Sequence, residues 1–303
     1  LPHLPANIPD MRTPVARVVA METVYIGYLE ALGKLDTIVG AASADYISNT
    51  RVRAAIEDGS IQKVQSGAAL NIERVLLLQP ELILTSISGD PAFDLPANLT
   101  RAGLPVVLCA GYMEQHPLAR AEWIQFIAAF FDADAPATEL FEAIAARYET
   151  LRQSIEHIEP RPTVFCGAPY SGAWHMAGGE STTAQAIRDA GGQYLWSDIR
   201  GSGAIPLDTE RVFLRAAHAD IWLHPSFYQS RAELYAADAR FGKFHAAQHG
   251  YVFNNTKQRS ASGANPIWEA GVVQPDEVLA DLIKIFHPQR MPDTDFVYYE
   301  QLK

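Results

Sequence analysis

Several features are scarce or missing in this 303-residue chain, and each absence excludes a class of protein. Basic residues are in deficit, with 24 Lys and Arg against 35 Asp and Glu, and a net charge of −11 argues against binding to nucleic acid phosphates. No apolar run approaches the roughly 20 residues of a membrane-spanning helix. The two cysteines, Cys109 and Cys166, each end an apolar run, which predicts buried thiols rather than a disulfide. We therefore expect a soluble globular protein that does not bind nucleic acid.

Sequence motifs of enzymes and metal sites are also missing. The nine histidines are scattered without the spacing of a zinc site. No Gly-x-Ser-x-Gly nucleophile turn occurs, and Met21-Glu22-Thr23 stands where a phosphate-binding glycine loop would follow the first strand. We therefore expect no catalytic residue, no cofactor of the protein's own and no metal held by the protein alone. His224, which ends a predicted strand, is the single candidate for a metal ligand. A metal-dependent enzyme on a two-lobed α/β scaffold is the alternative from another class.

The chain contains an internal repeat. Asn71-Ile72-Glu73-Arg74-Val75 leads into an apolar run that ends at Leu84, and Asp208-Thr209-Glu210-Arg211-Val212 leads into one that ends at Leu223. The two glutamates lie 137 positions apart (210 minus 73). Each copy predicts a helix that is capped by Asn or Asp, carries a glutamate in its first turn and precedes a buried strand. A repeat at this spacing indicates two structurally similar lobes.

Glu73 and Glu210 have two interpretations. Taken singly, each is explained as a glutamate placed at a helix N-terminus, where the helix dipole favours a carboxylate. Their equivalence on two lobes favours a role at the surface that both lobes share.

Strands alternate with helices along both halves, which is typical of α/β lobes with mainly parallel sheets. The predicted strands are 17–20, 37–41, 81–85, 105–109, 163–166, 221–224 and 251–254, and the clearest short helices are 24–32, 99–103 and 182–190.

One long amphipathic segment separates the halves. Between Ala135 and Glu159, apolar residues recur every three or four positions, and Pro160 closes the segment. About 24 helical residues span roughly 36 Å, enough for a stiff connection between two lobes. We therefore predict an N-terminal α/β lobe over 1–134, a linking helix over 135–160 and a C-terminal α/β lobe over 161–303. The expected fold is two Rossmann-like lobes joined by one rigid helix, with the ligand cleft between them.

The chain resembles, over nearly its whole length, the periplasmic binding proteins of ABC importers for iron–siderophores, haem and cobalamin, in which a single long helix joins two α/β lobes. The segments that carry the resemblance are Val18 to Gly33, Ile38 to Gly40, Asn71 to Leu84, Leu99 to Pro105, Gly178 to Gly192 and Trp268 to Pro288. In that family a glutamate on each lobe pairs with arginines of the two permease subunits, and Glu73 and Glu210 match those positions. The resemblance thus gives the repeat a function in docking.

The resemblance also implies a location and partners. It implies a monomeric periplasmic protein that meets the membrane only through an ABC permease dimer. Because the chain starts at Leu1 without a leader, we expect that a signal peptide has been removed. The expected ligand is a small metal chelate that carries iron or cobalt. An iron–siderophore is the first choice, and cobalamin and haem are the alternatives, the latter with His224 or a tyrosine as axial ligand.

The loops that follow the strand ends supply the candidate ligand contacts, since ligands of open α/β sheets bind there. Many are aromatic, which suits a bulky and partly polar organic ligand, although each aromatic taken singly is equally well explained as core packing. Arg259 is the preferred partner for anionic oxygens. The candidates are Glu22, Tyr25, Tyr46, Ser86, Tyr112, Tyr170, Trp174, Phe227, Tyr228, Arg259 and Trp268, with Thr23, Asn49 and Ser88 beside them.

Overall fold

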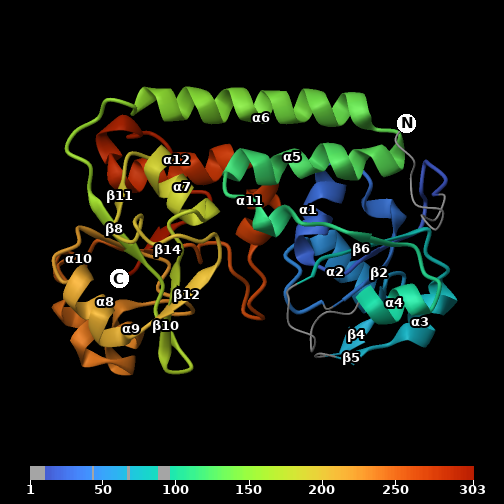
Figure 1. Cartoon of the computed structure of the whole chain (residues 1–303), viewed down its shortest axis with the longest axis horizontal. Coiled ribbons are helices and arrows are strands. Elements are labelled where there is room, and N and C mark those ends of the chain that lie inside the picture. Colours follow the sequence, from blue (N-terminus) through green and yellow to red (C-terminus); the bar gives the residue numbers. More distant parts are fainter. Residues whose placement is uncertain (1–10, 43, 67–68, 88–95) are drawn as a thin grey trace. The chain divides into compact units, whose positions relative to one another are not determined.

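The computed structural model describes residues 11–42, 44–66, 69–87 and 96–303 (Figure 1). Internal contacts divide the chain into two compact units. Unit 1 comprises Leu1–Tyr112, Glu122–Phe141 and Ser260–Val273. Unit 2 comprises Met113–Ala121, Glu142–Arg259 and Gln274–Lys303. The segment 260–273 thus groups with the first half of the chain, and the domain boundaries drawn from the sequence at 134 and 160 stay predictions.

Unit 1 is built on a five-stranded sheet in the order β3-β2-β1-β6-β7, and all its neighbours pair in parallel. The four strands predicted in the first half are confirmed as members of this one sheet. Its strands are β1 (Val18–Ala20), β2 (Ile38–Ala41), β3 (Gln62–Lys63), β6 (Leu82–Thr85) and β7 (Val106–Leu108). The accompanying elements are α1 (Thr23–Ala31), η1 (Leu35–Thr37), α2 (Thr50–Glu57), β4 (Gln65–Ser66), β5 (Ala69–Leu70), α3 (Ile72–Leu78), α4 (Pro96–Arg101) and η2 (Gly111–Met113).

Both faces of this sheet are buried, as expected for a parallel sheet between layers of helices. Successive residues of β1 point to opposite sides, so Val18 belongs to one apolar cluster and Val19 to another. The larger cluster also includes Val272 and Val273 of α11 (Ala270–Val273), a helix that packs against α1. Gly27 of α1 permits this approach, because a Cβ there would lie 2.6 Å from the carbonyl oxygen of Glu269.

Unit 2 contains two sheets. The five-stranded sheet has the order β11-β8-β13-β14-β15, and it is parallel except for the last strand. Its strands are β8 (Thr163–Cys166), β11 (Gln193–Tyr194), β13 (Ile221–Leu223), β14 (Val252–Asn254) and β15 (Glu300–Gln301). The three-stranded sheet is antiparallel and was not predicted from the sequence. Its strands are β9 (Pro169–Tyr170), β10 (Ala173–Ala177) and β12 (Ala204–Leu207).

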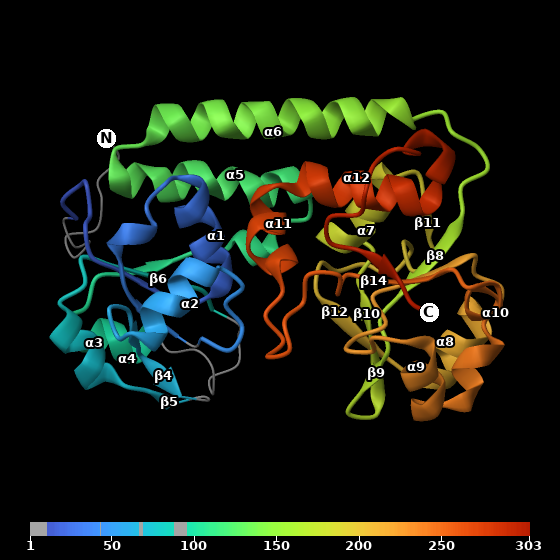
Figure 2. The same cartoon turned by 180° about the vertical axis from the view of Figure 1, so that it is seen from behind.

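The helices of unit 2 are mostly short. They are α7 (Thr182–Asp189), α8 (Thr209–Ala216), α9 (Arg231–Ala237), η4 (Ala239–Lys243), α10 (His245–His249), α12 (Pro275–Phe286) and η6 (Pro288–Arg290) (Figure 2). The remaining elements are α5 (Pro117–Ala128), η3 (Ala129–Phe131), α6 (Asp134–Ser154) and η5 (Pro266–Trp268). None of the described helices combines the length and the apolar character that a membrane crossing requires.

The long helix predicted from the sequence is confirmed as α6, although it ends five residues before the predicted Glu159. Its first residues, up to Phe141, group with unit 1, and the remainder groups with unit 2. Near its end, Arg152 donates two hydrogen bonds to the Glu149 carboxylate at 2.6 and 2.8 Å, and this guanidinium lowers the Glu149 pKa to about 2. A cation in the last turn also complements the helix dipole.

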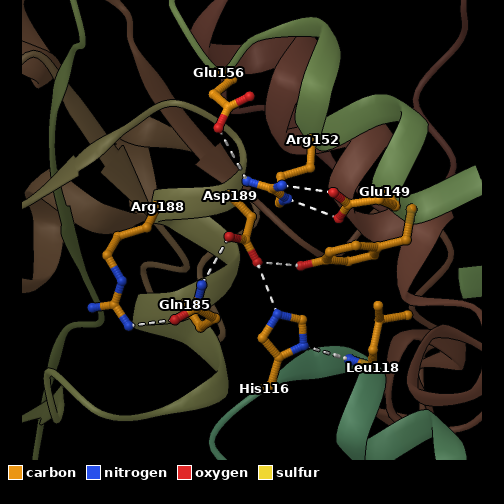
Figure 3. A network of polar contacts seen from close by, with 9 residues as sticks. His116, Leu118, Glu149, Arg152, Glu156, Gln185, Arg188 and Asp189 are labelled. Carbon is orange, nitrogen blue, oxygen red and sulfur yellow. Dashed lines mark hydrogen bonds and ion pairs between the residues drawn. The ribbon is translucent and has the colours of Figure 1, made fainter.

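A polar network connects the second half of α6 to other elements of unit 2 (Figure 3). The hydroxyl of Tyr148 donates to the buried carboxylate of Asp189 at 2.7 Å, and Gln185 of α7 donates to its other oxygen at 2.8 Å. Nε2 of His116 lies 3.5 Å from the same carboxylate. Since Nδ1 of His116 accepts from the amide of Leu118, the neutral ring carries its proton on Nε2 and donates it toward Asp189. The network therefore joins α6, α7 and the residues before α5.

Candidate ligand-binding and docking sites

Unit 1 has a pocket of about 340 Å³ where β1 and β2 end, the edge at which the sequence predicted ligand contacts. Two predicted residues, Glu22 and Tyr46, line it, and so does Thr23. Asp45 and Gln65 also line it and were not predicted. Two carboxylates, an amide and an exposed phenol ring give this pocket hydrogen-bond acceptors beside a flat apolar surface, an arrangement that suits a polar organic ligand.

Tyr25 does not line this pocket. Its ring belongs to the core of unit 1, and its hydroxyl donates to Glu22 at 3.4 Å. Burial, reinforced by the nearby Glu22 carboxylate, raises the Tyr25 pKa far above its ordinary value, so the phenol keeps its proton. This corrects the prediction of a ligand contact, because the side chain has almost no exposed surface. Tyr25 instead supports Glu22.

The corresponding surface of unit 2 is a pair of side chains after β13 and β14. Phe227 is 67% exposed, and the guanidinium carbon of Arg259 lies 5.4 Å from its ring centroid. This distance is within the range of a cation–π interaction. The pair offers a flat apolar face next to a planar cation, which can bind carboxylate, catecholate or hydroxamate oxygens. Both residues were predicted from the sequence as ligand contacts.

The loop that carries Phe227 has a strained backbone. His224 and Ser226 have φ angles of 53° and 57°, a left-handed conformation that is rare for residues other than glycine. The side-chain amide of Asn254, at the buried end of β14, donates to the carbonyl oxygens of Ser226 at 3.0 Å and Tyr228 at 2.8 Å. These two bonds hold the turn in place. Asn254 is thus a positioning residue that the sequence reasoning missed.

His224, the candidate metal ligand, already has a partner. Its Nε2 is hydrogen-bonded to the hydroxyl of Tyr299, and burial lowers its pKa to about 4. Within the described ranges, no three His, Cys, Asp or Glu side chains gather closely enough to hold a metal ion. An axial bond through Nε2 would have to displace Tyr299.

Trp174 lies in the core of unit 2. Its side chain is fully buried among Phe165, Trp222 and Phe244, and its indole N–H donates to the carbonyl oxygen of Cys166 at 2.8 Å. The prediction that Trp174 lines the ligand site is therefore wrong, because the alternating strand β10 directs this ring into the core of unit 2.

The other predicted contacts lie on the surfaces of their units. Tyr112 and Trp268 of unit 1 and Tyr170 of unit 2 are exposed, whereas Ser86 and Tyr228 are only partly so. Ser88 lies outside the described residues. Whether these side chains touch a ligand stays a prediction.

The repeated glutamates are exposed in the first turns of two helices. Glu73 lies in α3 and Glu210 in α8. The caps are supplied by their neighbours, since the Asn71 side chain accepts from the amide of Arg74 at 2.9 Å, and the Asp208 side chain accepts from the amide of Glu210 at 2.8 Å. Capping therefore does not require the glutamates, and both of these side chains are exposed at the surface.

Comparison with known proteins identifies the family. The sequence model of a family described as periplasmic binding protein matches residues 18–258. The chain belongs to this family. An uncharacterized lipoprotein of Methanocaldococcus jannaschii is 24% identical over 292 residues, which cover 93% of this chain and 68% of that protein.

Solved structures of other binding proteins share the fold. A periplasmic haem-binding protein of Pseudomonas aeruginosa matches with a TM-score of 0.70 and 16% identity, covering 95% of this chain and 98% of that one. The molybdate-binding protein of a Haemophilus influenzae ABC transporter matches with a TM-score of 0.71 and 17% identity, covering 95% and 90%. At these identities the likeness shows the two-lobed α/β fold, confirming the predicted fold class. The family is one of solute-binding proteins, and together with the lipoprotein relative it indicates an extracytoplasmic location.

Proposed function

We propose that this periplasmic binding protein is the substrate-binding component of an ABC importer for a metal chelate, with an iron–siderophore as its first candidate ligand. It acts as a monomer outside the cytoplasm and delivers the chelate to a permease dimer. The observation that carries the proposal is the pair of exposed carboxylates, Glu73 and Glu210, at equivalent positions of two capped helices in a protein of this family.

The chemistry of the surfaces at the strand ends supports this ligand class. The Arg259–Phe227 pair is suited to an anionic and partly aromatic group, such as the catecholate or hydroxamate oxygens of a ferric chelate. The unit 1 pocket lined by Glu22 suits the hydroxyl, amide or ammonium groups of an organic ligand. The metal, iron or cobalt, arrives with the ligand.

Cobalamin and haem are the alternative ligands, and the exposed aromatic side chains are the observation that favours them. Tyr46, Tyr170 and Trp268 can each stack on part of a flat macrocycle. Cobalamin needs no arginine, however, and the cation over Phe227 supports the ferric chelate as the first candidate.

Native mass spectrometry tests the ligand class. The protein is incubated with a ferric hydroxamate, a ferric catecholate, cyanocobalamin and haemin, each at equal concentration, and the mass of the complex identifies what remains bound. We expect retention of a ferric chelate and a loss of retention in Arg259→Ala. Retention of cyanocobalamin or haemin that is unchanged by Arg259→Ala would assign the ligand to the macrocycles instead.

A further inference from the structure

The two most exposed large apolar side chains among the described residues are a pair of leucines. Leu77 of α3 and Leu214 of α8 are each 84% exposed, against 67% for Phe227, the next in rank. They lie 137 positions apart (214 minus 77), the same spacing that separates Glu73 from Glu210. The leucines are therefore equivalent members of the internal repeat, one on each unit.

Each leucine lies on the same side of its helix as the glutamate of that helix. Leu77 follows Glu73 by four residues, and Leu214 follows Glu210 by four, so each pair is adjacent along the helix surface. The inner faces of the same helices are anchored separately, because Val75 and Val212 are fully buried. The leucines are thus not needed to attach either helix to its unit.

A single exposed leucine needs no explanation, since scattered apolar side chains are common on protein surfaces. Two exposed leucines at equivalent positions of a repeat do need an explanation, because each lies beside a carboxylate for which a partner has been proposed. Each lobe thus presents one apolar side chain next to one anion. The complementary partner is a protein with two equivalent sites, each of which has an apolar pocket next to a cation.

We propose that Leu77 and Leu214 are the apolar anchors of the transporter-docking surface, inserting into equivalent apolar pockets of the two permease subunits beside the cations that bind Glu73 and Glu210. The inference rests on the proposed function and adds to it a feature of the partner. The charged pairs orient the protein on the permease, and burial of the leucines slows its dissociation.

The test measures docking directly and does not depend on the identity of the ligand. The cognate importer is immobilised in lipid nanodiscs, and the Kd of the unloaded protein is measured by biolayer interferometry. Each leucine can contribute about tenfold to the affinity when it is buried. The double variant Leu77→Ser with Leu214→Ser is therefore expected to raise the Kd at least tenfold, and each single change should raise it by less. The double variant Leu77→Met with Leu214→Met should keep the Kd within about threefold of the parent's.

The controls separate docking from folding and from binding to lipid. Melting temperatures of the serine variants should equal that of the parent, because the replaced side chains are exposed. Tyr251→Ser, which removes an exposed aromatic side chain of unit 2 directly before β14, should leave the Kd unchanged. Nanodiscs without the importer should bind neither parent nor variant. Leucine-dependent binding to such nanodiscs would identify a lipid surface as the partner and overturn the inference.

A second variant keeps this test apart from the proposed function. If Glu73→Lys with Glu210→Lys abolishes docking while the double serine variant docks like the parent, the inference about the leucines is overturned and the docking role of the glutamates stands. If both variants dock like the parent, the inference and the proposed docking role are overturned together.

Discussion

The guanidinium of Arg240 binds the carboxylate of Glu210. One nitrogen, Nη1, lies 2.5 Å from Oε1 of Glu210, while Nε and Nη2 donate to Asp238 and lower its pKa. The same guanidinium lies over Phe213 of α8, with its carbon 4.8 Å from the ring centroid. Glu210 thus already has an internal cation, whereas no ion pair joins Glu73 to another described residue.

This ion pair predicts an effect on docking. An incoming permease cation must share Glu210 with Arg240, so Arg240→Ala should tighten docking to the importer by roughly threefold, the scale of an exposed ion pair. Lys243→Ala, which removes a neighbouring cation of η4, should have a smaller effect. Interferometry with importer nanodiscs measures both. Weaker docking of Arg240→Ala would mean that Arg240 orients Glu210 rather than competing for it.

Arg259 should contribute to ligand affinity without contributing to stability. Arg259→Ala removes hydrogen bonds to an anionic ligand and should weaken binding by about 1.5–3 kcal/mol, the range for bonds to charged groups. Titration with the ferric chelate selected by mass spectrometry measures the loss. Arg290→Ala, a change of an exposed arginine elsewhere on unit 2, serves as the matched control. An affinity within twofold of the parent would return Arg259 to the class of solvated surface arginines.

The Asp189 network should stabilise unit 2. Tyr148→Phe keeps the ring and removes the hydroxyl that donates to Asp189 at 2.7 Å, so it leaves a buried carboxylate with one partner fewer. The expected cost is about 1–3 kcal/mol in the free energy of unfolding. Urea unfolding measures it, with Tyr251→Phe on the surface as control. Equal midpoints for Tyr148→Phe and the parent would show that the network is dispensable for stability.

His224 predicts a dependence of stability on pH. Burial lowers its folded-state pKa to about 4 from the ordinary value of 6.5. Between these values the unfolded chain binds more protons than the folded one, so this contribution to stability is complete above pH 6.5 and is lost as the pH falls toward 4. His224→Asn, which suits the left-handed backbone at this position, should make the melting temperature fall less steeply over that range. Parallel curves for variant and parent would exclude His224 as the cause.

The sequence predicted the central strands of the parallel sheets because these strands are continuous apolar runs, whereas the short strands β3, β11 and β15 were not predicted. Almost every residue of β6, β8 and β13 is buried. A short continuous apolar run of this kind is typical of a strand that is covered on both faces. The antiparallel sheet of unit 2 was missed for the opposite reason. In β10 a buried Trp174 precedes an exposed His175, and an alternation this short does not distinguish a strand from a loop that carries an aromatic ligand contact. The same misreading placed Trp174 in the ligand site.

The residues of the candidate sites were predictable only where local sequence carries the signal. Glu22, Tyr46, Phe227 and Arg259 follow strand ends, and the glutamates were found through the repeat. The bonds of Asn254 to the 224–228 loop and of Arg240 to Glu210 join residues about 30 positions apart. Glu269 likewise reaches the amides of Ser48 and Asn49 from more than 200 positions away. Tertiary packing sets these pairs, and no local pattern encodes them.

The central claim is that this protein delivers its ligand to an importer through the two equivalent glutamates. The most direct measurement is ATP hydrolysis by the cognate importer in proteoliposomes, stimulated by the protein loaded with the chelate that mass spectrometry identifies. Glu73→Lys with Glu210→Lys should bind the chelate with the parent's affinity and fail to stimulate hydrolysis, because two attractive contacts become like-charge contacts that cost several kcal/mol. Each single change should stimulate partly. Stimulation by the double variant equal to that by the parent would contradict the account.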